Sequence, residues 1–173
     1  MAMVRPTLEV DLLRAQHADV LQEFVSGDDR IDQFVRGLFF LDPEDPFDKG
    51  AAPTSRLRVV VVEPDPELPR CYSKMWGACV VLERRFPGMT HSGFWEFRLL
   101  RLHRDGLNWS LPERLEVQGQ LIALAKERLL VLNNPPTQVG SFYNPGPELL
   151  ELLRTLEFFE SDVDEGYWYW RLR

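Results

Sequence analysis

The sequence predicts an α/β (α+β) fold in which one mixed, mostly antiparallel sheet is flanked by helices. β-branched and apolar runs recur at residues 56–63, 73–86 and 94–103 with irregular connections between them, which is typical of consecutive antiparallel strands. A capped, amphipathic run at 110–130 follows and predicts a helix that packs on this sheet. With 173 residues and 45% hydrophobic content, we expect one domain, residues 1–173, with a sizeable core.

The N-terminal third predicts one strand and two helices before the first long strand. An alternating stretch at 7–13 predicts the strand, and helical spacing at 17–24 and 30–41 predicts the helices. Residues 42–55 contain three prolines and a glycine among acidic side chains, which leaves no room for a regular element. We expect a surface loop there that could serve as a lid.

The helix at 110–130 has a well-marked start. Ser110 is followed three residues later by Glu113, which forms a capping box, and Pro112 lies in the first turn, where no intrahelical donor is needed. A helix N-terminus carries about half a positive charge and unpaired N–H groups, so it can bind a phosphate if the preceding loop lets the oxygen atoms approach.

Beyond this helix the sequence predicts a strand, a helix and a closing strand. The run NNPP at 133–136 breaks the chain, residues 137–144 predict a short strand, and residues 148–159 predict a leucine-rich helix. The C-terminal run GYWYWRLR alternates like a strand with both faces covered. The predicted order is therefore β, α, α, β, β, β, α, β, α, β.

Composition excludes several classes of function. A net charge of −7 and a pI near 5.0 argue against general nucleic-acid binding, because a phosphate backbone attracts concentrated Lys and Arg. No transmembrane or secretory segment is visible, so we expect a cytoplasmic protein that does not bind a membrane. The two cysteines and three histidines show no metal-ligand spacing, and we expect no metal.

Four local motifs stand in a recognisable order along the chain: VLQEFVSGDDRIDQFVRG, EFRLLRLHRD, LLRTLEFF and YWYWRLR. Together with the order of elements, they resemble the GNAT (Gcn5-related N-acetyltransferase) superfamily over nearly the whole chain. The first is similar to the opening of some members, the second resembles their fourth strand and its exit, and the last two resemble their closing helix and last strand. The resemblance implies N-acyl transfer, in which an amine of a small molecule or protein attacks the thioester of acetyl-CoA or another acyl-CoA.

The sequence departs from the family pattern at the residues that carry the chemistry. The family's pyrophosphate loop aligns with residues 107–112, so Ser110 and Pro112 stand where glycines are expected. The usual tyrosine acid falls on Leu153, and the glycine of the closing motif falls on Glu157. The alternative is therefore a noncatalytic GNAT-like binding or regulatory module that no longer uses CoA.

The resemblance also selects candidate site residues. Glu96, on the presumed fourth strand, is the candidate base, because a carboxylate shielded from water can take a proton from an amine; the competing interpretation is a surface glutamate paired with Arg84 or Arg98. Tyr143 is the candidate acid, against the alternative of a packed aromatic. The candidate cofactor-binding residues are Leu100, Leu102, Leu107, Asn108, Trp109 and Ser110.

The aromatic C-terminal strand suggests one further expectation. Residues 167–170 could supply a wall for the substrate, fill the core, or pair across a homodimer interface.

Overall fold

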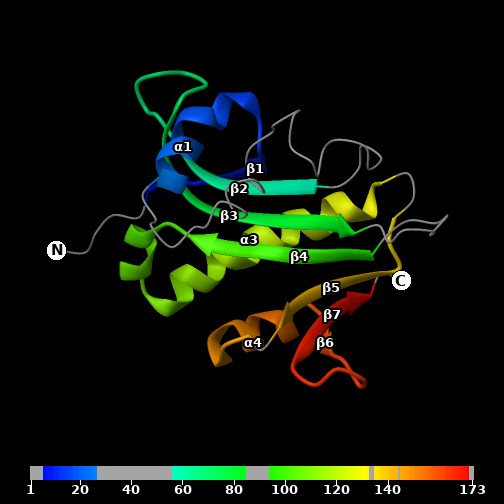
Figure 1. Ribbon diagram of the computed structural model, residues 1–173. Helices are drawn as coiled ribbons and strands as arrows, with labels where there is room; N and C mark the ends of the chain where they lie inside the picture. The colour runs from blue at the N-terminus through cyan, green and yellow to red at the C-terminus, as the bar shows by residue number, and fades with distance from the viewer. Residues whose placement is uncertain (1–5, 27–55, 85–93, 133–134, 144, 172–173) are drawn as a thin grey trace.

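A computed structural model describes residues 6–26, 56–84, 94–132, 135–143 and 145–171 (Figure 1). The helix predicted at 30–41 and the lid predicted at 42–55 lie outside these residues. The described strands are β1 (Glu9–Leu12), β2 (Arg56–Pro64), β3 (Tyr72–Arg84), β4 (Phe94–Leu102), β5 (Gln138–Tyr143), β6 (Phe158–Glu160) and β7 (Tyr167–Arg171). The described helices are α1 (Ala18–Ser26), α3 (Leu111–Leu130) and α4 (Pro147–Thr155), with short 3-10 helices η1 (Ala15–His17) and η2 (Arg104–Asn108).

The strands form one sheet in the order β1-β2-β3-β4-β5-β7-β6. Each neighbouring pair is antiparallel except β4 and β5, which run parallel. The predicted mixed, mostly antiparallel sheet is thus confirmed. The parallel pair arises because α3 carries the chain across one face of the sheet between these two strands, as parallel neighbours require.

Helices cover both faces of the sheet, and the valine run of β2 shows why. Val59 and Val61 pack into the core on the α3 side, whereas Val60 and Val62 pack into the core on the α1 side. All four are fully buried, because successive strand residues point to opposite faces. Figure 1 shows α1 and α3 on opposite faces of the sheet.

α3 lies close against the strands that lead to the candidate site. A Cβ atom added at Gly77 would lie 3.2 Å from the Arg101 carbonyl oxygen and 3.2 Å from a Leu121 methyl group, so this glycine permits the close approach of helix and sheet. Leu130, at the end of the amphipathic run, is 50% exposed, whereas Val117 is fully buried. The buried positions of α3 are Val117, Leu121, Ile122, Ala125 and Leu129.

The predicted helix at 148–159 is wrong in its last part. α4 ends at Thr155, and Glu157 adopts φ 66°, a left-handed conformation that stops the helix. The next three residues form β6, in which Phe158 pairs with Trp170 of β7. Leucine-rich spacing continued the helical pattern through this point, but pairing with β7 and burial of Phe158 favour a strand.

Candidate functional site

The parallel strands β4 and β5 are paired for a short distance and then diverge. Within the described residues they share two rungs, Trp95 with Val139 and Glu96 with Gly140. β5 continues beyond these rungs to Tyr143, which pairs with Tyr167 of β7 instead. Figure 1 shows β5 moving away from β4 in the direction of the C-terminal end of β4. The sheet therefore opens between its two central parallel strands.

A bulge in β4 accompanies this divergence. Val80 of β3 pairs with Leu99 and Val81 pairs with Phe97, so Arg98 is an extra residue on β4. A bulge bends the strand that carries it and increases its local twist. The bulge follows the last β4–β5 rung by two residues, which places the bend where the two strands separate.

Glu96, the predicted base, lies on the last rung before the opening. It is half-buried, with its Oε1 atom shielded from solvent. Its partner across β3 is Leu82, whereas Trp95 and Phe97 point into the core on the α3 side. Because neighbours along a strand face opposite ways, the Glu96 carboxylate lies on the α1 side of the sheet.

The structure places Tyr143, the predicted acid, on the strand that turns away. Its backbone lies three residues beyond Gly140 on β5, and its side chain falls outside the described atoms. Its role as an acid stays a prediction. Leu153, where the resemblance places the usual tyrosine, is fully buried in the core, and a leucine supplies no proton.

The predicted cofactor-binding residues fall into two groups. The side chains of Leu100 and Leu102 pack against the hydrophobic core, so a ligand between the strands would meet their backbone. Leu107 is 60% exposed and Asn108 is exposed on η2, just before α3. Trp109 is half-buried, and its ring centroid lies 4.6 Å from that of Trp76.

The capping box predicted at the start of α3 is confirmed. The Ser110 N–H donates to Glu113 Oε2 at 2.9 Å, and the Ser110 hydroxyl donates to the same oxygen at 2.7 Å. In the preceding loop, the Gly106 N–H donates to the His103 carbonyl and the Trp109 N–H donates to the Gly106 carbonyl. Because these two amides form hydrogen bonds within the loop, they are not available to bind a pyrophosphate as the backbone of the usual loop does.

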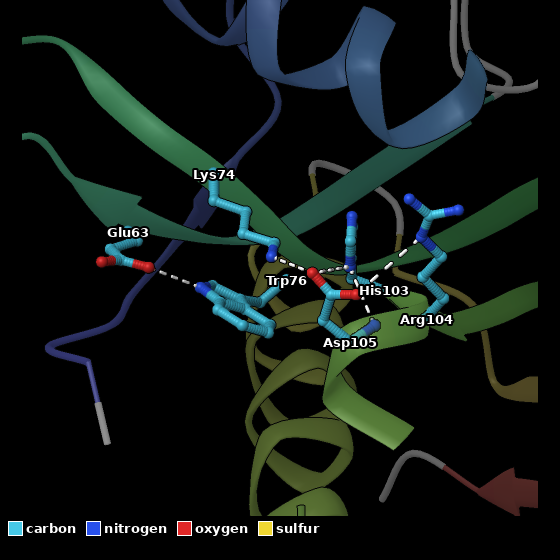
Figure 2. Close-up of polar contacts among 6 residues, drawn as sticks. All are labelled: Glu63, Lys74, Trp76, His103, Arg104 and Asp105. Atoms are coloured by element: carbon cyan, nitrogen blue, oxygen red, sulfur yellow. Dashed lines mark hydrogen bonds and ion pairs between the residues drawn. The ribbon is translucent and has the colours of Figure 1, made fainter. Parts of the chain in front are cut away.

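A polar cluster lies beside this loop, and sequence reasoning missed it (Figure 2). Lys74 at the start of β3 forms an ion pair with Asp105 of η2, although 31 residues separate them. The Lys74 Nζ lies 4.2 Å from the Trp76 ring centroid. Because β2, β3 and the exit of β4 meet only in the folded chain, no local sequence motif predicts this cluster.

Charge and burial set the protonation of two groups in the cluster. The hydrogen bond from Lys74 holds the pKa of Asp105 below its usual value. Burial, followed by the nearby Lys74 charge, lowers the pKa of His103. The His103 Nδ1 accepts the Asp105 N–H at 3.1 Å, which a protonated Nδ1 could not do. His103 is therefore neutral near pH 7.

Among the described residues, no group of three or more His, Cys, Asp and Glu side chains gathers as metal ligands would. Likewise, none of the described helices is both long enough and apolar enough to span a membrane.

Comparison with known proteins gives the fold a context. No family model and no curated protein matches this chain. A chain from the crystal structure of the NatC complex bound to Gag peptide and CoA aligns with a TM-score of 0.59 at 10% identity, over 96% of this chain and 99% of that one. A chain from AtaTR bound with AcCoA aligns with a TM-score of 0.56 at 11% identity, over 95% and 92%.

A chain from the KacTA–DNA complex aligns with a TM-score of 0.56 at 10% identity, over 95% of this chain and 93% of that one. These neighbours are GNAT acetyltransferases. At such low identity the likeness shows the fold alone, and at that level the resemblance read from the sequence is confirmed.

Proposed function

We propose that this GNAT-like chain is an N-acyltransferase that uses acetyl-CoA or another acyl-CoA. The divergence of β4 and β5 after the Glu96–Gly140 rung supports this most directly. A strand edge that leaves its neighbour presents N–H and C=O groups to whatever lies alongside. A pantetheine arm carries amides that can pair with such an edge, and its thioester would then lie near the last rung.

In this proposal Glu96 removes a proton from the acceptor amine. An amine is mostly protonated near neutral pH and attacks a thioester only after losing that proton. Glu96 lies on the α1 side at the rung where the strands part, so the amine would approach from that side. The attack forms a C–N bond and breaks the C–S bond, and the departing thiolate takes a proton, for which Tyr143 is our candidate donor.

Binding tests the proposal before any acceptor is known. Thermal and chemical unfolding should be measured with CoA, acetyl-CoA and longer acyl-CoAs. A ligand at about a hundred times its Kd adds about 2.7 kcal/mol to the free energy of unfolding. ADP, which has the diphosphate but no pantetheine arm, is the control ligand. No stabilisation by any acyl-CoA would remove the support for acyl transfer.

A noncatalytic binding module is the second candidate function, and the loop before α3 favours it. The carboxylate of Glu113 already accepts a hydrogen bond from the Ser110 N–H, and Leu153 stands where the family usually has its tyrosine acid. This candidate predicts no response to acyl-CoA and a ligand or partner of another kind. The KacTA neighbour comes from a complex with DNA, but the net charge of −7 leads us to retain the prediction of no nucleic-acid partner here.

A further inference from the structure

The Asp105 carboxylate lies where side chains of three basic residues converge (Figure 2). Lys74 forms an ion pair with its Oδ2, the Arg104 Nε lies 3.8 Å from its Oδ1, and the His103 Nδ1 lies 3.7 Å from its Oδ2. His103 accepts a backbone N–H through that nitrogen, so the two cations are Lys74 and Arg104. One exposed carboxylate thus occupies the meeting point of two positive charges.

Lys74 is held more firmly than an ordinary surface lysine. Its side chain is 25% exposed and extends over the Trp76 ring. Trp76 is fixed in turn, since its Nε1 donates to Glu63 Oε2 at 2.8 Å. An ammonium group positioned over a fixed indole gains a cation–π contact and has little freedom left to lose when an anion binds.

Asp105 is the exposed member of the pair. Half of its side-chain surface is in contact with solvent, and it belongs to a short 3-10 helix at the surface. An ion pair in such a place contributes little to stability, because water and salt screen it. An incoming anion of higher charge could therefore replace this carboxylate at low cost.

We propose that Lys74 and Arg104 form an anion site for a phosphate group of the acyl donor's nucleotide, and that the incoming phosphate displaces Asp105. The site lies between the exit of β4 and the start of α3, beside a loop whose amides do not form the usual cradle. Two side-chain cations would replace the missing backbone contacts, since both pair well with phosphate. This inference rests on the proposed function for the identity of the donor.

Calorimetric titration with inorganic pyrophosphate, CoA and pantetheine tests the site. Lys74→Met and Arg104→Met should each weaken pyrophosphate and CoA about tenfold, because each removes one charged contact. Asp105→Asn should strengthen both ligands several-fold, because it removes the competing carboxylate. Pantetheine, which has no phosphate, should bind all variants alike.

Matched variants separate charge from folding. Arg128→Met removes one positive charge from the exposed last turn of α3, away from the site, and should leave CoA binding unchanged. Lys74→Arg keeps the charge and should retain most of the affinity. The Arg104 side chain is 74% exposed, so Arg104→Met disturbs little packing. This variant therefore still tests the site if Lys74→Met does not fold.

The outcomes distinguish this inference from the proposed function. CoA binding that is unchanged in both Lys74→Met and Arg104→Met overturns the anion site and leaves acyl transfer standing. Pyrophosphate binding that requires Lys74, with no binding of CoA or pantetheine, supports an anion site at Lys74 but overturns both its assignment to the acyl donor and the proposed function. Wild-type protein that binds neither pyrophosphate nor CoA overturns both.

Discussion

Glu96 on β4 and Gly140 on β5 form the last paired rung before the two parallel strands diverge. The rung fixes one strand against the other, and the bulge at Arg98 bends β4 two residues later. Glu96 thus lies at the closed end of the opening, and Leu82 is its neighbour on β3. If a thioester occupies the opening, Glu96 is the carboxylate that we expect beside it.

Replacing Glu96 by Gln tests its role as the base. The amide keeps the shape of the side chain but cannot take the proton, so we expect the turnover of a good amine acceptor to fall about a hundredfold or more. CoA affinity should not change, because the substitution leaves the strand edges intact. Glu127→Gln, on the exposed side of α3, is the matched control. Unchanged turnover in Glu96→Gln would exclude Glu96 as the base.

Glu157 shows why a sequence-based alignment with the family can be right while its residues differ. The resemblance places the glycine of the closing motif at this position, and Glu157 indeed adopts φ 66°. A left-handed conformation costs a non-glycine residue about 1–2 kcal/mol. The position therefore keeps the backbone geometry of the motif without its residue, and the strain is carried by the rest of the fold.

Glu157→Gly should stabilise the protein by about 0.5–1 kcal/mol. Glycine removes the left-handed strain, although it also makes the unfolded chain more flexible, which offsets part of the gain. Urea-induced unfolding measures the difference. Glu157→Ala removes the same carboxylate but keeps the Cβ atom, so it should bring no gain. Equal stability of the Gly and Ala variants would show that the conformation is not strained.

Much of the fold follows from local chemistry, but the opening and the polar cluster do not. The start of α3 is visible in the sequence because Ser110 and Glu113 cap each other across three residues. In contrast, the β4–β5 opening depends on which strand β5 pairs with after Gly140. The Lys74–Asp105 pair joins residues 31 positions apart, and only the assembled sheet brings them together.

Lys126 connects α3 to the end of α4 and should matter for stability. Its Nζ donates to the Leu156 carbonyl at 2.6 Å and lies 4.4 Å from the Trp170 ring centroid. Burial lowers the pKa of this lysine. Its charge nevertheless stabilises a carbonyl at the end of a helix, where no donor within the helix is available. We expect Lys126→Met to lower the free energy of unfolding by about 1–2 kcal/mol.

Lys126→Arg is the control for this prediction, because it keeps both the charge and a donor near Leu156. It should lose less stability than the Met variant in the same urea titration. A Met variant as stable as wild type would mean that the ammonium group adds nothing to the stability that the apolar part of the side chain provides.

His17 should make stability depend on pH. The ring is fully buried, and its Nδ1 accepts the Arg14 N–H at 3.0 Å. Burial lowers the pKa of His17, so the unfolded chain binds the proton more readily, with a pKa of about 6.5. The stability that neutral His17 provides is therefore complete above about pH 6.5 and is lost as the pH falls toward the folded-state value.

His17→Asn separates this effect from other titrating groups. The Asn Oδ1 can still accept the Arg14 N–H but does not titrate, so the free energy of unfolding should decline less between pH 7 and 5 than in wild type, by at most about 1.4 kcal/mol per pH unit. The pKa of His103 is also lowered, so some slope should remain, and His103→Asn measured in parallel accounts for it. The same slope in His17→Asn and wild type would mean that His17 does not titrate differently on folding.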